Sequence, residues 1–297
     1  MISVITATFN KLELSQAYLS SLEANPPPEP WEIIWVDDGS TDGTRDWLKT
    51  LQGPRHRVIY NNQNLGYAAS NNKGALQASG DVLCFLNNDL ILTPNWFPPL
   101  IRALKQIDNP GVVGNIQIGV ATQRIDHAGM GFDLIGRTIH PHKGSRISDI
   151  RGKGNCYKAV TAACWVVYKS VFIEAGGFDS AFRNGFEDAD LCLRLGQKGY
   201  QHWVSYEIPI YHHVSSSPGR KDRDAENLAL FLNKWAPLTS VYGQTDWPLY
   251  YIRRIIHQPS HLNAGKLIDA LLRITRLRHG DSAWARRERI KAMSTMS

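Results

Sequence analysis

Short apolar runs alternate with amphipathic segments over residues 1–90. The apolar runs predict buried strands at residues 2–7, 31–36, 57–60 and 82–86. The segments between them predict helices at residues 14–22, 44–51 and 67–78, and three consecutive prolines at 26–28 end the first helix. Strands that are apolar throughout and alternate with helices predict an α/β fold. We expect a mixed, mainly parallel sheet with helices on both faces, as in Rossmann-like domains.

Polar residues follow each of these four strands. They occupy residues 8–10, 37–40, 61–66 and 87–89. Ligands of parallel α/β sheets bind at the carboxyl ends of the strands. We therefore expect the four segments to meet in one polar crevice.

The second half of the chain has a less regular pattern. Residues 112–148 are rich in glycine and carry scattered Arg, Asp and His side chains, and we expect residues 124–143 to lie at the crevice. Further on, the pattern predicts a strand at 160–168, a helix at 187–198 and strands at 201–205 and 208–211. The last of these strands leads into His212 and His213.

Composition indicates a protein with an ordinary core, because 43% of the 297 residues are hydrophobic and 20% are charged. No apolar run approaches the roughly 18 residues of a membrane-spanning helix, and the chain opens directly with a strand pattern, so we expect neither a membrane span nor a targeting segment. The cysteines are far apart in apolar stretches, which predicts small buried side chains in a reduced, cytoplasmic compartment. They are Cys84, Cys156, Cys164 and Cys192.

Positive charge is concentrated at the end of the chain. Residues 251–297 hold ten Lys and Arg against three Asp and Glu, whereas residues 1–250 hold 23 against 24. A nucleic-acid-binding core would carry its basic stripe on the folded domain, so we expect no nucleic acid partner. Residues 266–278 predict a basic amphipathic helix, with Ala264, Leu267, Ile268, Leu271 and Leu272 on its apolar face. Such a helix either lies on an anionic membrane or packs against protein.

Acidic groups and histidines at the predicted crevice are candidates for chemistry. Asp89 ends a buried strand, where a carboxylate suits a hard cation bound to phosphates, although a plain turn explains the same residues. Glu187 and Asp188 begin a helix, either as a general base or as compensation of the helix dipole, whereas we assign Asp190 to an ion pair with Arg194. Because side chains alternate along a strand, only one of His212 and His213 can face the crevice.

An ordered set of motifs resembles the family 2 glycosyltransferases of the GT-A fold. It looks most like the bacterial branch that includes rhamnosyltransferases of surface-polysaccharide assembly, and it covers about residues 1–220. The motifs are VDDGSTDGT at 36–44, NLG at 64–66 with Asn71 and Gly74, LNND at 86–89, GGFD at 176–179, EDADLCLR at 187–194 and His212.

The resemblance implies an inverting enzyme that uses a nucleotide diphosphate sugar and Mg²⁺ or Mn²⁺. Asp188, with Glu187 beside it, would deprotonate the acceptor hydroxyl, and Asp89 and His212 would bind the metal. The residues implied for the donor are Thr8, Asn10, Asp37, Asp38, Asn64, Gly66, Asn71 and Asn88. In this sequence Asn87 replaces the first acid of the family's D-x-D motif, which removes one candidate anionic ligand and favours weak or water-mediated metal binding.

The expected organisation is a GT-A domain at 1–236 and a basic helical extension at 237–297. Within the domain, residues 1–108 would bind the donor and 109–236 would serve the acceptor and catalysis. The expected donor is a UDP-, dTDP- or GDP-sugar and the acceptor a glycan or lipid-linked glycan, with the enzyme in the cytoplasm or on the inner face of the membrane. The rival interpretations are a nucleotidyltransferase, which lacks support because residues 8–11 offer no glycine-rich basic loop, and a non-catalytic binding protein on the same scaffold. A dehydrogenase is excluded because no G-x-G-x-x-G follows the first strand.

Overall fold

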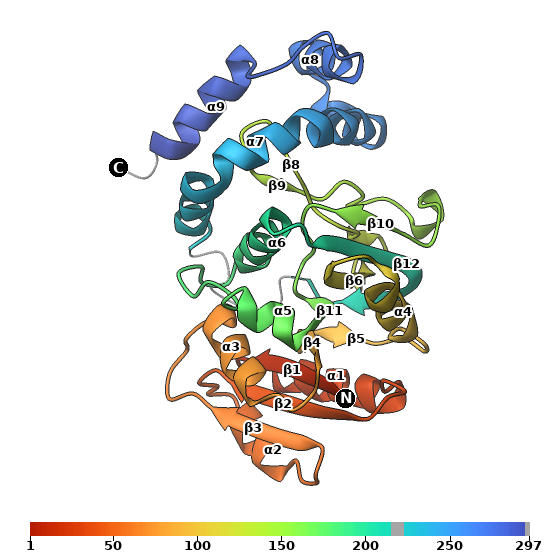
Figure 1. The fold of residues 1–297 in the computed structure, drawn as a ribbon, viewed down its shortest axis with the longest axis vertical. Coiled ribbons are helices and arrows are strands. Elements are labelled where there is room, and N and C mark those ends of the chain that lie inside the picture. The colour runs from red at the N-terminus through yellow and green to blue at the C-terminus, as the bar shows by residue number, and fades with distance from the viewer. Residues whose placement is uncertain (215–222, 295–297) are drawn as a thin grey trace.

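The computed structural model describes residues 1–214 and 223–294, and within them one large mixed sheet forms the centre of the molecule (Figure 1). Four parallel strands from the first half lie together in the order β4-β1-β2-β3. They are β1 (Ile2–Thr8), β2 (Trp31–Asp37), β3 (His56–Tyr60) and β4 (Val82–Leu86). The prediction of a mainly parallel sheet is confirmed for this half, and the four predicted strands match within one residue at each end.

The second half extends the sheet from β4 in the order β11, β6, β12 and β10. Antiparallel pairing of β11 with both β4 and β6 makes the sheet mixed. The strands are β6 (Pro110–Gly119), β10 (Gly154–Tyr157), β11 (Cys164–Tyr168) and β12 (Gln201–His212), with short β5 (Leu90–Ile91) on β12 and β7 (Ile125–His127) on β6. A separate hairpin pairs β8 (Gly131–Phe132) with β9 (Thr138–Ile139).

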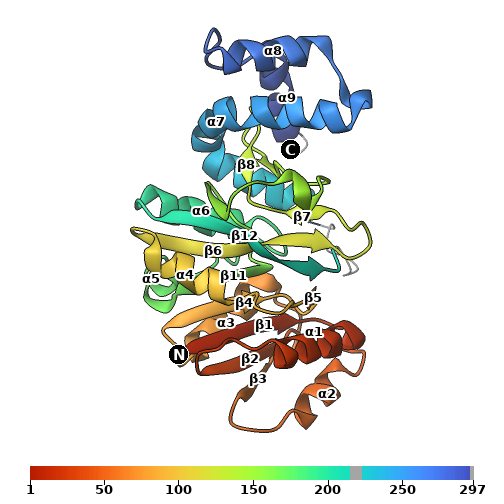
Figure 2. The same ribbon diagram turned by 90° about the vertical axis from the view of Figure 1, so that its right-hand side faces the viewer.

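Helices cover both faces of the sheet, as the sequence predicts (Figure 2). Side chains of β2 alternate between two buried clusters: Ile33 and Trp35 join one, Ile34 and Val36 the other. The helices that contribute side chains to the first cluster are α1 (Leu12–Ala24), α2 (Thr44–Thr50) and α4 (Pro98–Gln106). Those that contribute to the second are α3 (Tyr67–Gln77), α5 (Lys169–Glu174) and α6 (Glu187–Gln197).

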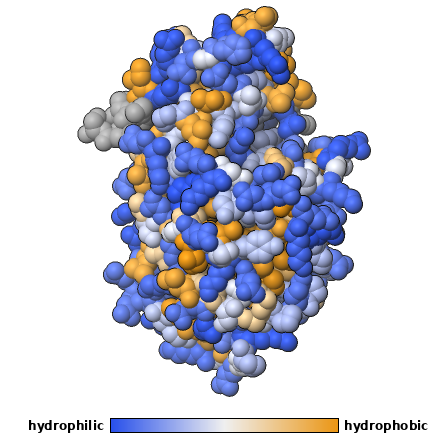
Figure 3. Space-filling model, viewed as in Figure 1, coloured by the Kyte–Doolittle hydropathy of each residue, from blue (hydrophilic) through white to orange (hydrophobic). Residues whose placement is uncertain are grey.

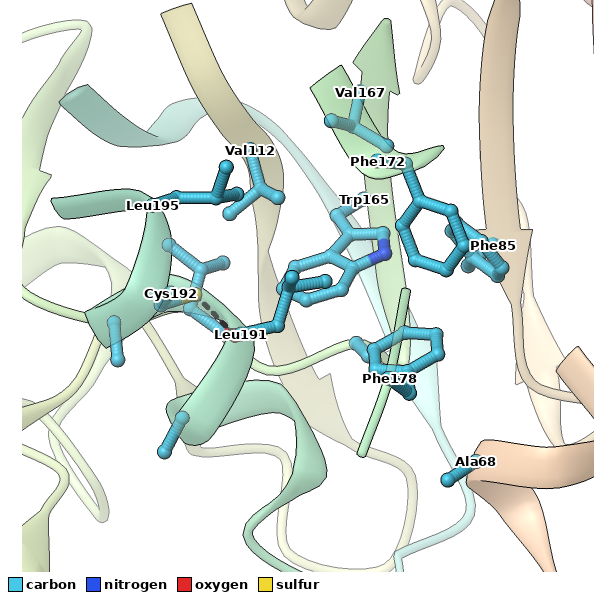
Figure 4. Close-up of a cluster of buried hydrophobic side chains, with 14 of the residues drawn as sticks. Ala68, Phe85, Val112, Trp165, Val167, Phe172, Phe178, Leu191, Cys192 and Leu195 are labelled. Atoms are coloured by element: carbon cyan, nitrogen blue, oxygen red, sulfur yellow. Dashed lines mark hydrogen bonds between the residues drawn. The ribbon is translucent and has the colours of Figure 1, made fainter. Parts of the chain in front are cut away.

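Aromatic rings fill the second cluster where the two halves of the domain meet (Figure 4). The Trp165 indole of β11 stacks on Phe178 with ring centroids 5.7 Å apart, and Phe85 of β4 meets Phe178 edge-on at 5.2 Å. Aromatic contacts of this kind add to the gain from area burial. They hold the segment between α5 and α6, which leads to Glu187 and Asp188, against β4 of the first half.

Three predicted elements have different bounds. The strand predicted at 160–168 begins at Cys164, because residues 160–163 form a loop instead. The strands predicted at 201–205 and 208–211 are one strand, β12, whose irregular register against β6 between Ser205 and Ile210 accounts for the interrupted pattern.

The interpretation of all four cysteines as buried is wrong for Cys156, which is exposed on the edge strand β10, while Cys84, Cys164 and Cys192 are buried.

Beyond the sheet, helices form the other end of the molecule (Figure 1). They are the long α7 (Asp224–His257), α8 (Ala264–Ile274) and α9 (Ala283–Ser294), with single 3₁₀ turns at Ile147–Asp149 and Pro259–His261. The expected boundary at residue 236 falls inside α7, which contains Pro237 and Pro248. Among the described residues, no helix combines the length and apolar character required to cross a bilayer.

Candidate functional site

One cavity of about 660 Å³ opens at the carboxyl ends of the four parallel strands. Thr8, Asp38, Asn64 and residues 87–89 line it from the ends of β1, β2, β3 and β4. The start of α6 and side chains from residues 126–143 also line it. The predicted convergence of four strand ends on one crevice is therefore confirmed, and the cavity is large enough for a ligand of nucleotide-sugar size.

Asp38 organises, through its buried carboxylate, the side of the cavity formed by the segments after β2 and β3, called here the donor side because the sequence predicts donor binding there. Its Oδ1 accepts hydrogen bonds from Leu65 N at 2.8 Å and from the side chains of Asn61 and Ser70. Its Oδ2 accepts from Gly66 N at 2.9 Å. A carboxylate that accepts four donors orders the segment that holds them, so Asp38 shapes the loop that presents Asn64.

Four of the residues implied for the donor do not line the cavity. Asp37 is fully buried and pairs with Arg45 at 2.6 Å, and Asn10 accepts a hydrogen bond from Thr41 N. The Asn71 amide donates to the backbone of its own helix, and Gly66 lies behind the cavity wall. These residues brace the strand ends. Thr8, Asp38, Asn64 and Asn88 do line the cavity, although the Asn88 amide is also tied to Thr8 Oγ1 at 3.0 Å.

Arg183 crosses the donor side and was not found from the sequence. Its guanidinium donates to the carbonyl oxygen of Asn64 at 2.8 Å and lines the cavity. Gly66 makes this crossing feasible, because it has φ +88° and a Cβ at that position would lie 2.9 Å from Cγ of Arg183. The only sequence signal was the glycine itself, since nothing local ties residue 183 to residue 64.

Asp89 and His212 lie together on the cavity wall. Oδ1 of Asp89 is 3.1 Å from Nε2 of His212, because β5 pairs with β12 and aligns Leu90 with His212. Adjacent ligands of an octahedral ion with bonds of about 2.1 Å are about 3 Å apart, so the pair fits Mg²⁺ or Mn²⁺. The described residues hold no group of three or more His, Cys, Asp and Glu suited to a metal, so other ligands would come from water or phosphate. His212 lines the cavity and His213 does not, in keeping with the expectation that only one of the two faces it.

A second carboxylate, Asp126, lies behind His212. Its Oδ2 is 3.7 Å from Nδ1 of His212, and its Oδ1 is 2.5 Å from Nζ of Lys143. Burial opposes a charge on His212, but the hydrogen bonds and charges of Asp126 and Asp89 outweigh it and raise the pKa of His212 to about 9. Without a metal, His212 is therefore protonated at neutral pH, and its two ring nitrogens face the carboxylates of Asp89 and Asp126.

Glu187 and Asp188 occupy the first turn of α6 and differ in their contacts. Oε2 of Glu187 turns back to accept from Gly185 N at 2.6 Å. Oδ2 of Asp188 accepts from Ala162 N at 3.2 Å, while the Tyr67 hydroxyl donates to the carbonyl oxygen of Ala162. The chain from Tyr67 through Ala162 to Asp188 therefore fixes the carboxylate on the cavity wall. The expected pair of Asp190 with Arg194 is also present, at 2.8 Å.

Two histidines and a glutamine line the side formed by residues 117–143. Nε2 of His127 accepts from Gly129 N and Thr161 N, so its proton is on Nδ1, which lies 3.3 Å from Nδ1 of His140. His140 accepts there and carries its own proton on Nε2. Burial lowers the pKa of His127 well below its ordinary value, consistent with a neutral ring.

Gln117 of β6 was not found from the sequence. It is fully buried on the cavity wall, and neither polar atom of its side chain has a hydrogen-bond partner among the described residues. A buried amide without partners is costly, so an amide in this position is suited to pairing with a ligand or water. No pattern marked it, because a single polar residue in an apolar strand is equally typical of a satisfied core position.

Comparison with known proteins gives one family for this chain. The model described as glycosyl transferase family 2 matches residues 3–174. The chain is 30% identical over 224 residues to the O-antigen biosynthesis protein RfbC of Myxococcus xanthus, which covers 73% of this chain and 17% of that protein. It is therefore similar to only a small part of RfbC.

Two further comparisons agree. The N-acetylglucosaminyl-diphospho-decaprenol L-rhamnosyltransferase of Mycobacterium tuberculosis is 24% identical over 245 residues, 74% of this chain and 78% of that one. The crystal structure of GalNAc-T7 with UDP, GalNAc and Mn²⁺ superposes with a TM-score of 0.65 at 17% identity, over 84% of this chain and 50% of that one, and supports the GT-A fold. Because the family model spans more than half of the 297 residues, the chain belongs to glycosyl transferase family 2.

Proposed function

We propose that the protein is an inverting glycosyltransferase that moves a sugar from a nucleotide diphosphate to a hydroxyl acceptor in the assembly of a bacterial surface polysaccharide or another glycan. The observation that carries this proposal is the cavity itself. It combines a preorganised side around Asp38, a metal-compatible pair at Asp89 and His212, and a fixed carboxylate at Asp188 in one cavity. Direct displacement at an anomeric carbon requires these three parts.

Asp188 is the proposed base. It takes the proton of the acceptor hydroxyl as the acceptor oxygen bonds to the anomeric carbon and the bond to the diphosphate breaks. A single displacement from the face opposite the leaving group inverts the anomeric centre. The backbone contact of Asp188 with Ala162 holds its carboxylate in place, whereas Glu187 bonds back to its own loop, which favours Asp188 over Glu187.

The donor side has the groups that a nucleotide diphosphate needs. Thr8, Asp38 and Asn64 would hold the base and ribose, and Arg183 would face the phosphates. Asp89 and His212 would hold Mg²⁺ or Mn²⁺, which when bound would neutralise charge on the departing diphosphate. The solved GalNAc-T7 complex contains UDP and Mn²⁺, which supports this assignment by its fold alone. The donor sugar is proposed to be a rhamnosyl or another hexosyl group carried on UDP, dTDP or GDP.

The acceptor side is proposed to lie along residues 124–143 and Gln117. Gln117 offers both a donor and an acceptor, which suits the hydroxyl groups of a sugar. The printed name of the mycobacterial relative describes a lipid-linked acceptor. We propose an acceptor of that general kind, a glycan or a lipid-linked glycan.

We further propose that residues 1–236 form the transferase domain, with the donor half at 1–108 and the acceptor half at 109–236, and residues 237–297 its helical extension. The cytoplasm is the proposed location. The four cysteines, all in described segments, are free thiols, which supports a reducing compartment.

The test is nucleotide release from a panel of UDP-, GDP- and dTDP-sugars with Mn²⁺ or Mg²⁺. We expect slow release from one donor, abolished by chelation and by Asp89→Ala. Asp188→Asn should bind that donor with unchanged affinity in calorimetry but transfer its sugar at least about 100-fold more slowly once an acceptor is found.

Glu187→Gln is the matched control, because it neutralises the neighbouring carboxylate. It should retain more transfer activity than Asp188→Asn. If Glu187→Gln loses transfer and Asp188→Asn keeps it, the base is Glu187. If no donor binds or turns over with any metal, the alternative of a non-catalytic nucleotide-sugar or carbohydrate-binding protein takes the lead.

A further inference from the structure

The end of the molecule farthest from β3 exposes a group of large apolar side chains, called here the α8 surface. It consists of Ile268, Leu271, Ile274 and Leu277, with exposed fractions of 56%, 48%, 44% and 76%. The first three are spaced by three residues on α8, so they lie along one side of the helix. Hydrophobic and hydrophilic side chains are intermixed at this end (Figure 3).

The orientation of α8 reverses the usual pattern of a surface helix. Its polar residues Asp269 and Arg273 are buried against α7 and pair at 3.1 Å, and the Trp284 indole donates to Asp269 at 2.8 Å. The predicted apolar face is therefore only partly packed, and Ile268 and Leu271 point to solvent. The Asp269 ion pair explains this orientation, because a buried carboxylate needs Arg273 and Trp284 beside it.

The segment of the chain that carries the α8 surface also has exposed cationic side chains. Arg254, Arg276, Arg286 and Arg287 are exposed, and within the described part of the chain they form no ion pair. Arg276 lies between Ile274 and Leu277 in sequence. Residues 251–297 as a whole carry a net charge of +7. The segment therefore combines exposed apolar side chains with uncompensated positive charge.

We propose that the α8 surface docks the enzyme on an anionic phospholipid membrane. Exposed Ile and Leu side chains would enter the interface between headgroups and acyl chains, and the arginines would contact the lipid phosphates. Charge complementarity favours this occupant over a second copy of the chain. An isologous dimer through the same surface would place two segments of net charge +7 against each other. The inference does not depend on the identity of the donor or acceptor.

Co-sedimentation of the full chain with vesicles tests the proposal. Vesicles of phosphatidylcholine with phosphatidylglycerol should bind the protein, vesicles of phosphatidylcholine alone should not, and high salt should release it. Leu271→Glu should lower binding to the anionic vesicles at least about tenfold, because it replaces an inserted side chain by a repelled charge. Leu76→Glu is the matched control, since Leu76 is 67% exposed on α3 of the sheet domain.

Thermal unfolding of both variants establishes that they fold. The proposal is overturned if the wild-type protein binds neither kind of vesicle, or if Leu76→Glu loses as much binding as Leu271→Glu. It is also overturned if sedimentation without lipid shows a dimer that Leu271→Glu dissociates, because the α8 surface would then bind a second copy.

Discussion

The position of His212 between two carboxylates predicts that metal binding depends steeply on pH. A metal requires the neutral imidazole, but Asp126 and Asp89 raise the pKa of His212 to about 9 against the effect of burial. At pH 7 only about 1% of the metal-free protein then has a neutral His212. Binding of Mn²⁺ at this pH must displace the proton, which weakens the apparent affinity about 100-fold, or by about 2.7 kcal/mol.

The direction of the pH dependence follows from the competition between the proton and Mn²⁺ for His212. Apparent Mn²⁺ affinity should rise about tenfold per pH unit between about pH 6 and pH 8, and level off above about pH 9. Free Mn²⁺ can be measured by electron paramagnetic resonance across this range. Calorimetry at pH 7 in two buffers of different ionisation enthalpy should detect release of close to one proton for each ion bound.

Two variants separate His212 from other titrating groups. His212→Gln should bind Mn²⁺ more weakly at high pH and lose most of the dependence on pH, whereas His213→Gln should behave as the wild-type protein because His213 does not line the cavity. The reasoning is refuted if the wild-type protein releases no proton at pH 7, or if His212→Gln keeps the wild-type slope. Absence of proton release would mean that His212 is neutral in the free protein or is not a ligand, and an unchanged slope in His212→Gln would mean that another group causes the pH dependence.

Two further predictions concern stability. Gly74→Ala in α3 should lower the free energy of unfolding by about 1–3 kcal/mol, because the new Cβ would lie 2.6 Å from Cγ2 of Ile5. Gly196→Ala in α6, with open space around it, should raise the free energy of unfolding by about 0.5–1 kcal/mol. Denaturant unfolding of both variants checks this, and changes of the same sign would contradict it. Gln117→Met should stabilise the free protein, since it removes a buried amide without partners, but should slow transfer; unchanged transfer would remove Gln117 from the acceptor side.

The fold of the first half of the chain could be predicted because the sequence pattern that determines it is local. Apolar strands, helices and polar strand ends alternate within residues 1–90, and parallel strands bring their carboxyl ends together at one edge. The motifs also located Asp38, Asp89 and Asp188 on the cavity. Asp37, in the same motif as Asp38, and Asn71, which accompanies the motif at 64–66, do not line the cavity, because a motif includes the residues that support a turn as well as those that face a ligand.

The helical end was predicted less well for physical reasons. Prolines 237 and 248 are typical helix breakers, yet α7 continues through both positions, where packing on the sheet domain outweighs the lost backbone hydrogen bonds. The apolar face of α8 was identified from its spacing, but its direction was not. That direction depends on the pairing of Asp269 with Arg273 and Trp284, which spacing alone cannot reveal.

The two sides of the cavity differ in how their polar atoms are satisfied, and this difference has consequences for evolution of the enzyme. On the donor side, the Asp38 carboxylate accepts four hydrogen bonds from its own chain, so a substitution there disturbs the fold as well as the ligand. On the acceptor side, the Gln117 amide has no partner among the described residues and gains its hydrogen bonds only from what enters the cavity. Exchange of such a residue costs the fold little and changes which hydroxyl groups are recognised. Differences in acceptor specificity between relatives should therefore concentrate around residues 117–143, and the residues around Asp38 should vary least.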